Sequence, residues 1–194
     1  MKLRWMQLTL LLAGFLLFGL ADVASAQTCF GLTPTIVGAV KIKGTPGNDV
    51  ILGSDFAHDS IDGGGGSDTI CGLGGDDQIK TKNGTAQVDG GAGNDRISVK
   101  AGGSGGSTVM GGAGDDTISF SAGGGGGNTV DGGADNDVIK ASSGGGGSNV
   151  VTGGSGDDQI KFNSGGGGGN TVDGGLGTDT CKAKGAEPDC ENVN

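Results

Sequence analysis

The sequence predicts an all-β protein built as a solenoid of parallel strands, and three observations support this. Near-copies of one nine-residue pattern recur along the chain, and five of them begin 21 residues apart, at residues 90, 111, 132, 153 and 174. A fixed period of this length is typical of solenoids, in which each repeat stacks on the previous one. Of the 194 residues, 48 are Gly and 4% are aromatic, so a conventional core of large apolar side chains is not expected.

The N-terminal segment, residues 1–26, is expected to be a secretory signal peptide. Lys2 and Arg4 precede an apolar stretch over residues 8–20, and the small residues at 24–26 fit a cleavage site. The apolar stretch is shorter than the roughly 20 residues that cross a bilayer, so no membrane span is expected, and an uncleaved anchor is the alternative. We therefore expect a mature chain that is secreted or extracellular, with retention in the cell envelope as the other location.

Export also bears on the four cysteines, Cys29, Cys71, Cys181 and Cys190. In an oxidising compartment they are expected to form two disulfides, for which three connectivities are open. We favour Cys29 with Cys71 and Cys181 with Cys190, because this pairing would staple each end of the array separately. Residues 27–43 and 183–194 are predicted to be N-terminal and C-terminal caps around repeats that occupy residues 44–182.

Two nine-residue units form one coil, and in the later coils the second unit is stretched to twelve residues, which gives the 21-residue period. Each coil is predicted to contain two short strands. Because side chains alternate between the faces of a strand, the recurring apolar residues should form two ladders that face each other inside the solenoid. One ladder is Ile97, Ile118, Ile139 and Ile160, the other is Val109, Val130, Val151 and Val172, and Val99, Phe120, Ala141 and Phe162 should also point inward. Asn128, Asn149 and Asn170 are predicted to stack as a third ladder.

Each glycine turn ends in an aspartate, in the pattern Gly-Gly-x-Gly-x-Asp followed by one apolar residue. The sixth position is Asp49, Asp68, Asp77, Asp95, Asp116, Asp137, Asp158 and Asp179. Stacked turns would place these carboxylates about 5 Å apart, and like charges repel unless a cation lies between them. Ca²⁺ takes oxygen ligands, and glycine turns can direct several carbonyls at one ion. The alternative is that the aspartates only favour tight turns.

This pattern resembles the calcium-binding nonapeptide of the RTX (repeats-in-toxin, or hemolysin-type) family over residues 44–182. The resemblance implies a right-handed parallel β-roll, or β-helix, in which the eight aspartates and backbone carbonyls of successive turns hold Ca²⁺ as the cofactor. Asp49 and Asp68 would lie on one side of the coil and the other six on the opposite side, with about six ions if each gap holds one. The chain departs from the pattern at Leu73 and Asp135, which replace glycines, and at His58, which shifts the register before Asp59.

Composition argues against several other functions. A net charge of −10 disfavours nucleic acid as a partner, and His58 is the only histidine, so no enzyme site is expected. The predicted function is calcium binding by a secreted repeat protein, in which Ca²⁺ drives folding of the solenoid without catalysis. The alternative is an extracellular adhesion or matrix-recognition module that uses a solenoid face, with ice recognition by stacked threonines less favoured. The sequence does not identify the extracellular partner.

Overall fold

The computed structural model describes residues 27–102, 106–124, 126–166, 168–185 and 191–192. These residues form 17 strands, and they contain no helix. The predicted signal peptide lies outside the described residues. In the described part of the chain, no helix is long and apolar enough to span a bilayer.

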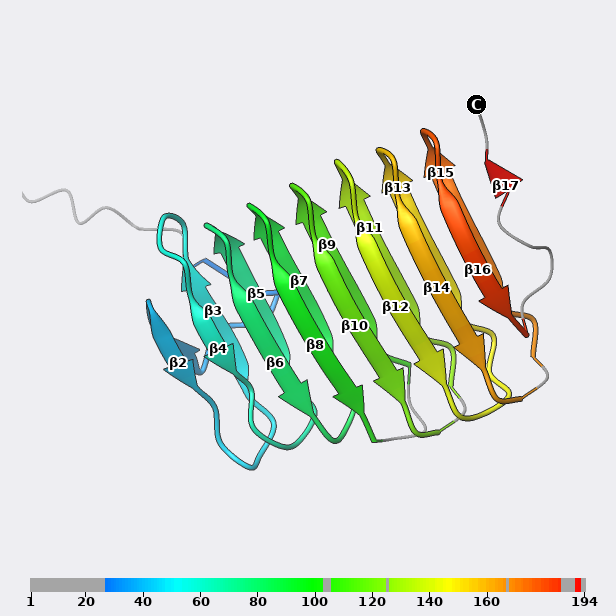
Figure 1. The fold of residues 1–194 in the computed structure, drawn as a ribbon. Helices are drawn as coiled ribbons and strands as arrows, with labels where there is room; N and C mark the ends of the chain where they lie inside the picture. Colours follow the sequence, from blue (N-terminus) through cyan, green and yellow to red (C-terminus); the bar gives the residue numbers. More distant parts are fainter. Residues whose placement is uncertain (1–26, 103–105, 125, 167, 186–190, 193–194) are drawn as a thin grey trace, which may run out of the picture.

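The strands form two parallel sheets, which lie face to face along the whole solenoid (Figure 1). The nine-stranded sheet consists of β1 (Ile36–Val37), β3 (Val50–Ser54), β5 (Thr69–Gly74), β7 (Gln87–Ala92), β9 (Thr108–Ala113), β11 (Thr129–Ala134), β13 (Val150–Ser155), β15 (Thr171–Leu176) and β17 (Glu191–Asn192). The eight-stranded sheet consists of β2 (Lys41–Lys43), β4 (Ser60–Asp62), β6 (Gln78–Lys82), β8 (Arg96–Ala101), β10 (Thr117–Ala122), β12 (Val138–Ser143), β14 (Gln159–Ser164) and β16 (Thr180–Lys184). The chain passes from one sheet to the other after nearly every strand.

Strand pairing follows the sequence period. Ile118 lies opposite Ile97 on one side and Ile139 on the other, so neighbours in the sheet are 21 residues apart. Val130 pairs in the same way with Val109 and Val151. This register confirms the predicted all-β solenoid of parallel strands, with two strands in each coil.

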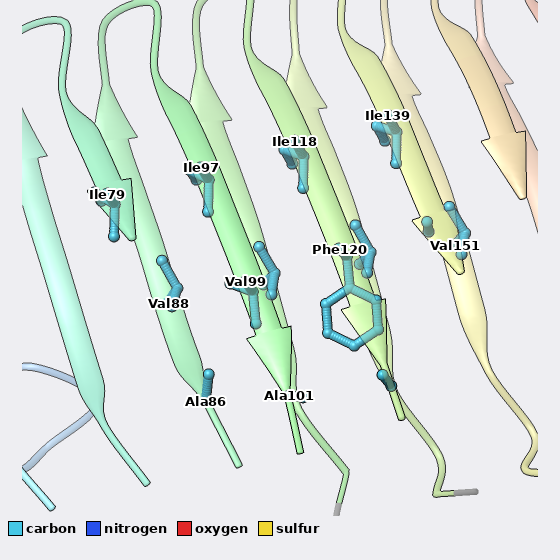
Figure 2. Packing of buried hydrophobic residues seen from close by; sticks show 14 of the residues in the cluster. Ile79, Ala86, Val88, Ile97, Val99, Ala101, Ile118, Phe120, Ile139 and Val151 are labelled. Carbon is cyan, nitrogen blue, oxygen red and sulfur yellow. The ribbon is translucent and has the colours of Figure 1, made fainter. Parts of the chain in front are cut away.

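The core is a single layer of side chains from each sheet (Figure 2). The isoleucine and valine ladders are buried along the solenoid, and the first extends back to Ile42, Ile61 and Ile79. Val99, Phe120, Ala141 and Phe162 are also buried, as predicted. Because successive side chains of a strand point to opposite faces, only every second residue of each strand contributes to this layer.

A disulfide joins Cys29 to Cys71, with their Cα atoms 5.7 Å apart, and confirms the favoured pairing at this end. It packs against Leu52 outside the main core and attaches the N-terminal segment to β5. Cys181 is not a free thiol, but its predicted partner Cys190 lies outside the described residues. The predicted cap boundaries stay predictions; β1 and β2, which precede residue 44, pair with β3 and β4.

Candidate metal sites along the aspartate edge

Each coil reverses direction twice, and these reversals form the two long edges of the solenoid (Figure 1). At one edge, from β3–β4 to β15–β16, each tight turn ends in an aspartate, and we call this the aspartate edge. Its residues are Asp59, Asp77, Asp95, Asp116, Asp137, Asp158 and Asp179. At the other edge, the glycine edge, the corresponding residues are Asp49, Asp68, Ala86, Ser107, Asn128, Asn149 and Asn170. Six of the eight predicted metal-binding aspartates therefore share one edge and two lie on the other, as the sequence indicated.

Backbone hydrogen bonds link the aspartates of the aspartate edge into one continuous ladder. The backbone N–H of each aspartate donates to Oδ1 of the aspartate one coil later, as from Asp95 to Asp116 at 2.7 Å and from Asp116 to Asp137 at 2.8 Å. The same bond recurs from Asp59 to Asp179 at 2.7–2.9 Å. One oxygen of each carboxylate from Asp77 onward is thereby fixed in place by the neighbouring coil.

The second carboxylate oxygen has no hydrogen-bond partner. Oδ2 is buried and unpaired in Asp77, Asp95, Asp116, Asp137, Asp158 and Asp179. Most of these residues are almost fully enclosed, with Asp95 and Asp116 each 1% exposed. Buried polar atoms are nearly always paired in folded proteins, and an unpaired buried carboxylate is among the most costly exceptions. A row of six such atoms therefore points to a missing ligand with positive charge.

A backbone carbonyl converges with five of these six unpaired oxygens, those from Asp77 to Asp158. A Cβ placed on Gly90 would lie 2.3 Å from Asp95 Oδ2 and 2.5 Å from the carbonyl oxygen of Gly111 in the next coil. At Gly132 the same two distances, to Asp137 Oδ2 and to the Gly153 carbonyl oxygen, are 2.3 and 2.4 Å. Only glycine fits these positions, and the oxygens that face each other across the coils are acceptors. Acceptor oxygens from carboxylates and carbonyls are the ligands that Ca²⁺ takes.

Burial changes the protonation of these carboxylates. It raises the pKa of Asp95, Asp116 and Asp137 to about 7 and that of Asp77 to about 6, against the backbone hydrogen bond that each accepts. The negative charges of neighbouring aspartates raise these pKa values further. The arrangement thus holds anions where water is excluded, and a cation beside them would offset both the burial and the repulsion.

Side chains alone do not complete a metal site. In the part of the chain that the structure describes, no group of three or more His, Cys, Asp or Glu side chains comes together as metal ligands would. A cation at the aspartate edge would therefore depend on backbone carbonyls such as that of Gly111 in addition to the carboxylates. This requirement accounts for the glycines, since a side chain at Gly90 would block that approach.

The two predicted aspartates of the glycine edge have a different environment. The Asp49 backbone N–H donates to Asp68 Oδ1 at 3.2 Å, so the two residues are linked like those of the aspartate edge. However, Asp49 Oδ2 accepts a bond from the Thr45 N–H at 2.7 Å, and Asp68 Oδ2 accepts one from the Thr81 hydroxyl at 2.9 Å. The Oδ2 atoms of both residues therefore already have hydrogen-bond donors within the protein.

Asp59 belongs to the ladder although it was not among the predicted site residues. Its N–H donates to Asp77 Oδ1, and its own Oδ1 accepts a bond from the Val40 N–H. Its Oδ2 accepts two bonds from Ser54, from the N–H at 2.8 Å and from the hydroxyl at 2.9 Å. The extra residue in the turn before Asp59 obscured the repeat, and allowing a one-residue insertion there would have identified it.

A second ladder, also absent from the sequence analysis, runs along the outside of the same edge. It is formed by the fifth residue of each turn, namely His58, Asp76, Asn94, Asp115, Asn136, Asp157 and Thr178. Here the side chain accepts from the N–H of the following coil, as in Asp115 to Asn94 Oδ1 at 2.9 Å, which is opposite in direction to the inner ladder. Aspartates alternate with uncharged residues, so no two carboxylates of this outer ladder are adjacent.

The fold and this edge define a class of protein: a parallel β-solenoid whose turns present carboxylate and carbonyl oxygens to cations. A model of the RTX calcium-binding nonapeptide repeat, which spans four copies, matches residues 43–79, 83–100, 101–139, 122–160 and 143–181. These matches cover most of the chain, and the chain therefore belongs to this family of calcium-binding repeats. No curated protein and no solved structure matches it in the comparisons.

Proposed function

We propose that this protein is a secreted calcium-binding repeat protein in which Ca²⁺, held between successive turns of the aspartate edge, drives folding of the solenoid. The row of unpaired Oδ2 atoms carries this proposal. The residues that would hold the ions are Asp77, Asp95, Asp116, Asp137, Asp158 and Asp179, together with turn carbonyls such as that of Gly111. Ca²⁺ would supply positive charge that the protein itself does not place there.

The folding role follows from the small core. The two sheets contribute one apolar layer each, and the many glycines lose much backbone entropy on folding. The turns also place aspartate carboxylates next to one another, and their negative charges repel. Binding free energy at sites that exist only in the folded chain adds directly to folding free energy. We therefore propose that the chain without Ca²⁺ is largely unfolded.

The assignment has less support at Asp49 and Asp68. Their Oδ2 atoms accept hydrogen bonds from Thr45 and Thr81, so these two carboxylates do not require a cation. We propose that any ion between them binds more weakly than those at the aspartate edge.

Secretion is supported by two features. The N-terminal segment has the charge, apolar stretch and small residues of a signal peptide, and Cys29 and Cys71 form a disulfide, which is typical of exported proteins. The absence of catalysis is also part of this proposal. It is supported by the position of His58, the sole histidine, which lies in the outer ladder and accepts a bond from the Asp76 N–H.

The proposal is tested by circular dichroism of residues 27–194, first with EGTA and then during a Ca²⁺ titration, with Mg²⁺ as the control ion. The expected result is a cooperative gain of β signal with Ca²⁺ and not with Mg²⁺, accompanied by heat of binding for several ions. A full β signal in EGTA that Ca²⁺ does not change would contradict the proposal.

Surface recognition is a second candidate function. It is favoured by the Lys and Arg residues of the described chain, all of which lie on the eight-stranded sheet. Recognition of ice by the nine-stranded sheet has less support. Thr108, Thr129 and Thr171 do lie in one column, but Val150 interrupts it. The neighbouring outward column includes Asp131 and Asp173, so the sheet does not present a continuous threonine surface.

A further inference from the structure

All basic residues of the described chain lie on one face. Of the 12 Lys and Arg residues in the sequence, all except Lys2 and Arg4 stand at outward positions of the eight-stranded sheet, and all of these are exposed. They are Lys41, Lys43, Lys80, Lys82, Arg96, Lys100, Lys140, Lys161, Lys182 and Lys184. Asp62 is the sole acidic residue among the outward positions of this sheet. We call this surface the basic face.

The basic residues form two groups that follow the strand register. Lys140, Lys161 and Lys182 lie directly opposite one another on β12, β14 and β16, which makes a column of three ammonium groups at about the 4.8 Å strand spacing. The other group lies on β2, β6 and β8 and includes the neighbours Lys82 and Lys100. Between the groups, β10 presents only Thr117, Ser119 and Ser121.

The protein does not neutralise this charge itself. Within the described residues, the one close contact between a basic and an acidic side chain joins His58 to Asp76 on the aspartate edge, so none of the exposed lysines is paired with a carboxylate. The remaining acidic residues of the described chain lie on the two edges or on the nine-stranded sheet, where Asp89, Asp131 and Asp173 point outward. A chain with a net charge of −10 thus carries a strongly positive, almost flat surface.

The side chains between the lysines indicate the chemistry of the partner. They are mostly Ser, Thr, Gln and Asn, which donate and accept hydrogen bonds. The large exposed apolar residues of the described chain are Phe30, Leu32, Val37, Val40, Phe56, Val150 and Leu176, and none of them lies on this face. The face also has no exposed aromatic ring on which a nucleobase could stack. Repeated anionic groups combined with hydroxyl groups fit the surface better than an apolar or a base-stacking partner.

We propose that the basic face binds an anionic polysaccharide, a chain of sugars that carry carboxylate or sulfate groups. The anionic groups lie against the lysine column of β12, β14 and β16 and against the basic group on β2, β6 and β8. The sugar hydroxyl groups bond to the Ser, Thr, Gln and Asn side chains between them. This interaction is additional to calcium binding. It rests on the proposed function, because the basic face forms only when Ca²⁺ has folded the eight-stranded sheet.

The experiment measures binding of the Ca²⁺-loaded chain, residues 27–194, to hyaluronate and to dextran sulfate, with neutral dextran as the control polymer. Wild type is compared with K140Q/K161Q/K182Q and with K140R/K161R/K182R, which keeps the charge. Circular dichroism in the same buffer reports whether each variant is folded. A failure to fold is thereby separated from a failure to bind.

The expected result is binding to both anionic polymers and not to dextran, with affinity that falls as salt rises. The Gln variant should bind roughly tenfold more weakly and with a smaller salt dependence, because three charges no longer release counterions. The Arg variant should bind like wild type. Equal binding by folded wild type and Gln variant would overturn the proposal. So would binding confined to anionic vesicles, to duplex DNA or to a second copy of the chain.

Discussion

The two edges of the solenoid solve the same structural problem with different chemistry. At both edges, in most coils, the side chain of the residue that ends the turn accepts a hydrogen bond from a backbone N–H of the previous coil. At the glycine edge this residue becomes Asn, and Asn128 Nδ2 donates to Asn149 Oδ1 at 2.7 Å and to the Gly126 carbonyl at 2.9 Å. At the aspartate edge the corresponding atom is an oxygen, and it has no donor. The side-chain amides of the asparagines at the glycine edge have partners within the protein, whereas the unpaired oxygens of the aspartate edge are those that we propose to bind a cation.

This difference locates the proposed calcium requirement at one edge. It does not come from the solenoid shape, because the asparagines of the glycine edge keep the same 21-residue register with neutral groups. It arises from a single chemical difference, an amide nitrogen replaced by a carboxylate oxygen. The four predictions below change that difference on one edge or the other.

The largest effect is expected from pH in the absence of Ca²⁺, because it acts on the whole aspartate ladder at once. The pKa of Asp95, Asp116 and Asp137 is raised to about 7 in the folded chain, from an ordinary 3.8. The folded state therefore binds protons more tightly than the unfolded state, and its stability falls as pH rises from about 4 to about 7. In buffer stripped of metal ions, the β signal should be greater at pH 5.5 than at pH 8.

Saturating Ca²⁺ provides the control for this pH effect. At pH 8 it should restore the β signal that is lost without metal, since ligand carboxylates must be deprotonated to bind. A metal-free chain that is equally folded at both pH values would show that the ladder does not limit stability.

The next largest effect is expected from D116A/D137A in the presence of Ca²⁺. This variant removes two of the proposed cation ligands and the acceptors for the Asp95 and Asp116 N–H groups. Leaving two buried donors unpaired costs about 2–6 kcal/mol in total. Urea unfolding should show this loss, and calorimetry should show fewer bound ions. The matched control is D131A/D173A, which removes the same charge from the nine-stranded sheet and should keep the ion count.

A glycine on each edge gives the third test. An added Cβ at Gly112, whose φ is 120°, would lie 1.9 Å from the Gly91 carbonyl oxygen, whereas at Gly123 it would meet only the Ala101 carbonyl oxygen at 3.9 Å. G112A should therefore lower the free energy of unfolding by about 1–3 kcal/mol, and G123A should change it by less than about 0.5 kcal/mol. Equal thermal stability of the two variants would contradict the tight stacking of the aspartate turns.

An effect of similar size is expected when the chemistry of one edge is introduced into the other. N149D removes the donors to Asn170 Oδ1 and to the Gly147 carbonyl, at 2.7 and 3.0 Å. In Ca²⁺-saturated buffer, where the chain is folded, it should cost about 1–3 kcal/mol. S148D adds the same charge to the adjacent exposed residue and should cost less. If the two variants unfold at the same urea concentration, the asparagine ladder does not stabilise that edge.

The sequence predicted the parts of the structure that depend on the regular period. The 21-residue spacing was sufficient to place Ile118 opposite Ile97, to bury Phe120 and to stack Asn128 on Asn149. Assigning alternate units to opposite sides of the coil also separated Asp49 and Asp68 from the aspartates of the other edge. These features follow from alternation along a strand and from repetition between strands, both of which can be counted in the sequence.

The parts that were not predicted depend on side-chain contacts or on irregular turns. Nothing in the repeat indicates that Thr81 donates to Asp68, since other coils have an apolar residue at the same place. Asp59 was missed because its turn contains an insertion. The gathering of all exposed basic residues on one sheet was also missed, because the early coils around Lys41 and Lys80 have a shorter period than the later ones.

The uniform register between β8 and β14 makes the coils interchangeable. Gly111 and Gly132 occupy equivalent positions, and each lies against the carbonyl oxygen of the equivalent glycine one coil later. Removing residues 111–131 would therefore join equivalent positions and keep the same strand pairing between the remaining coils. Such a deletion shortens each sheet by one strand and the ladder by one aspartate. The length of the solenoid and the number of aspartates in the ladder therefore both increase by a fixed step with each added coil.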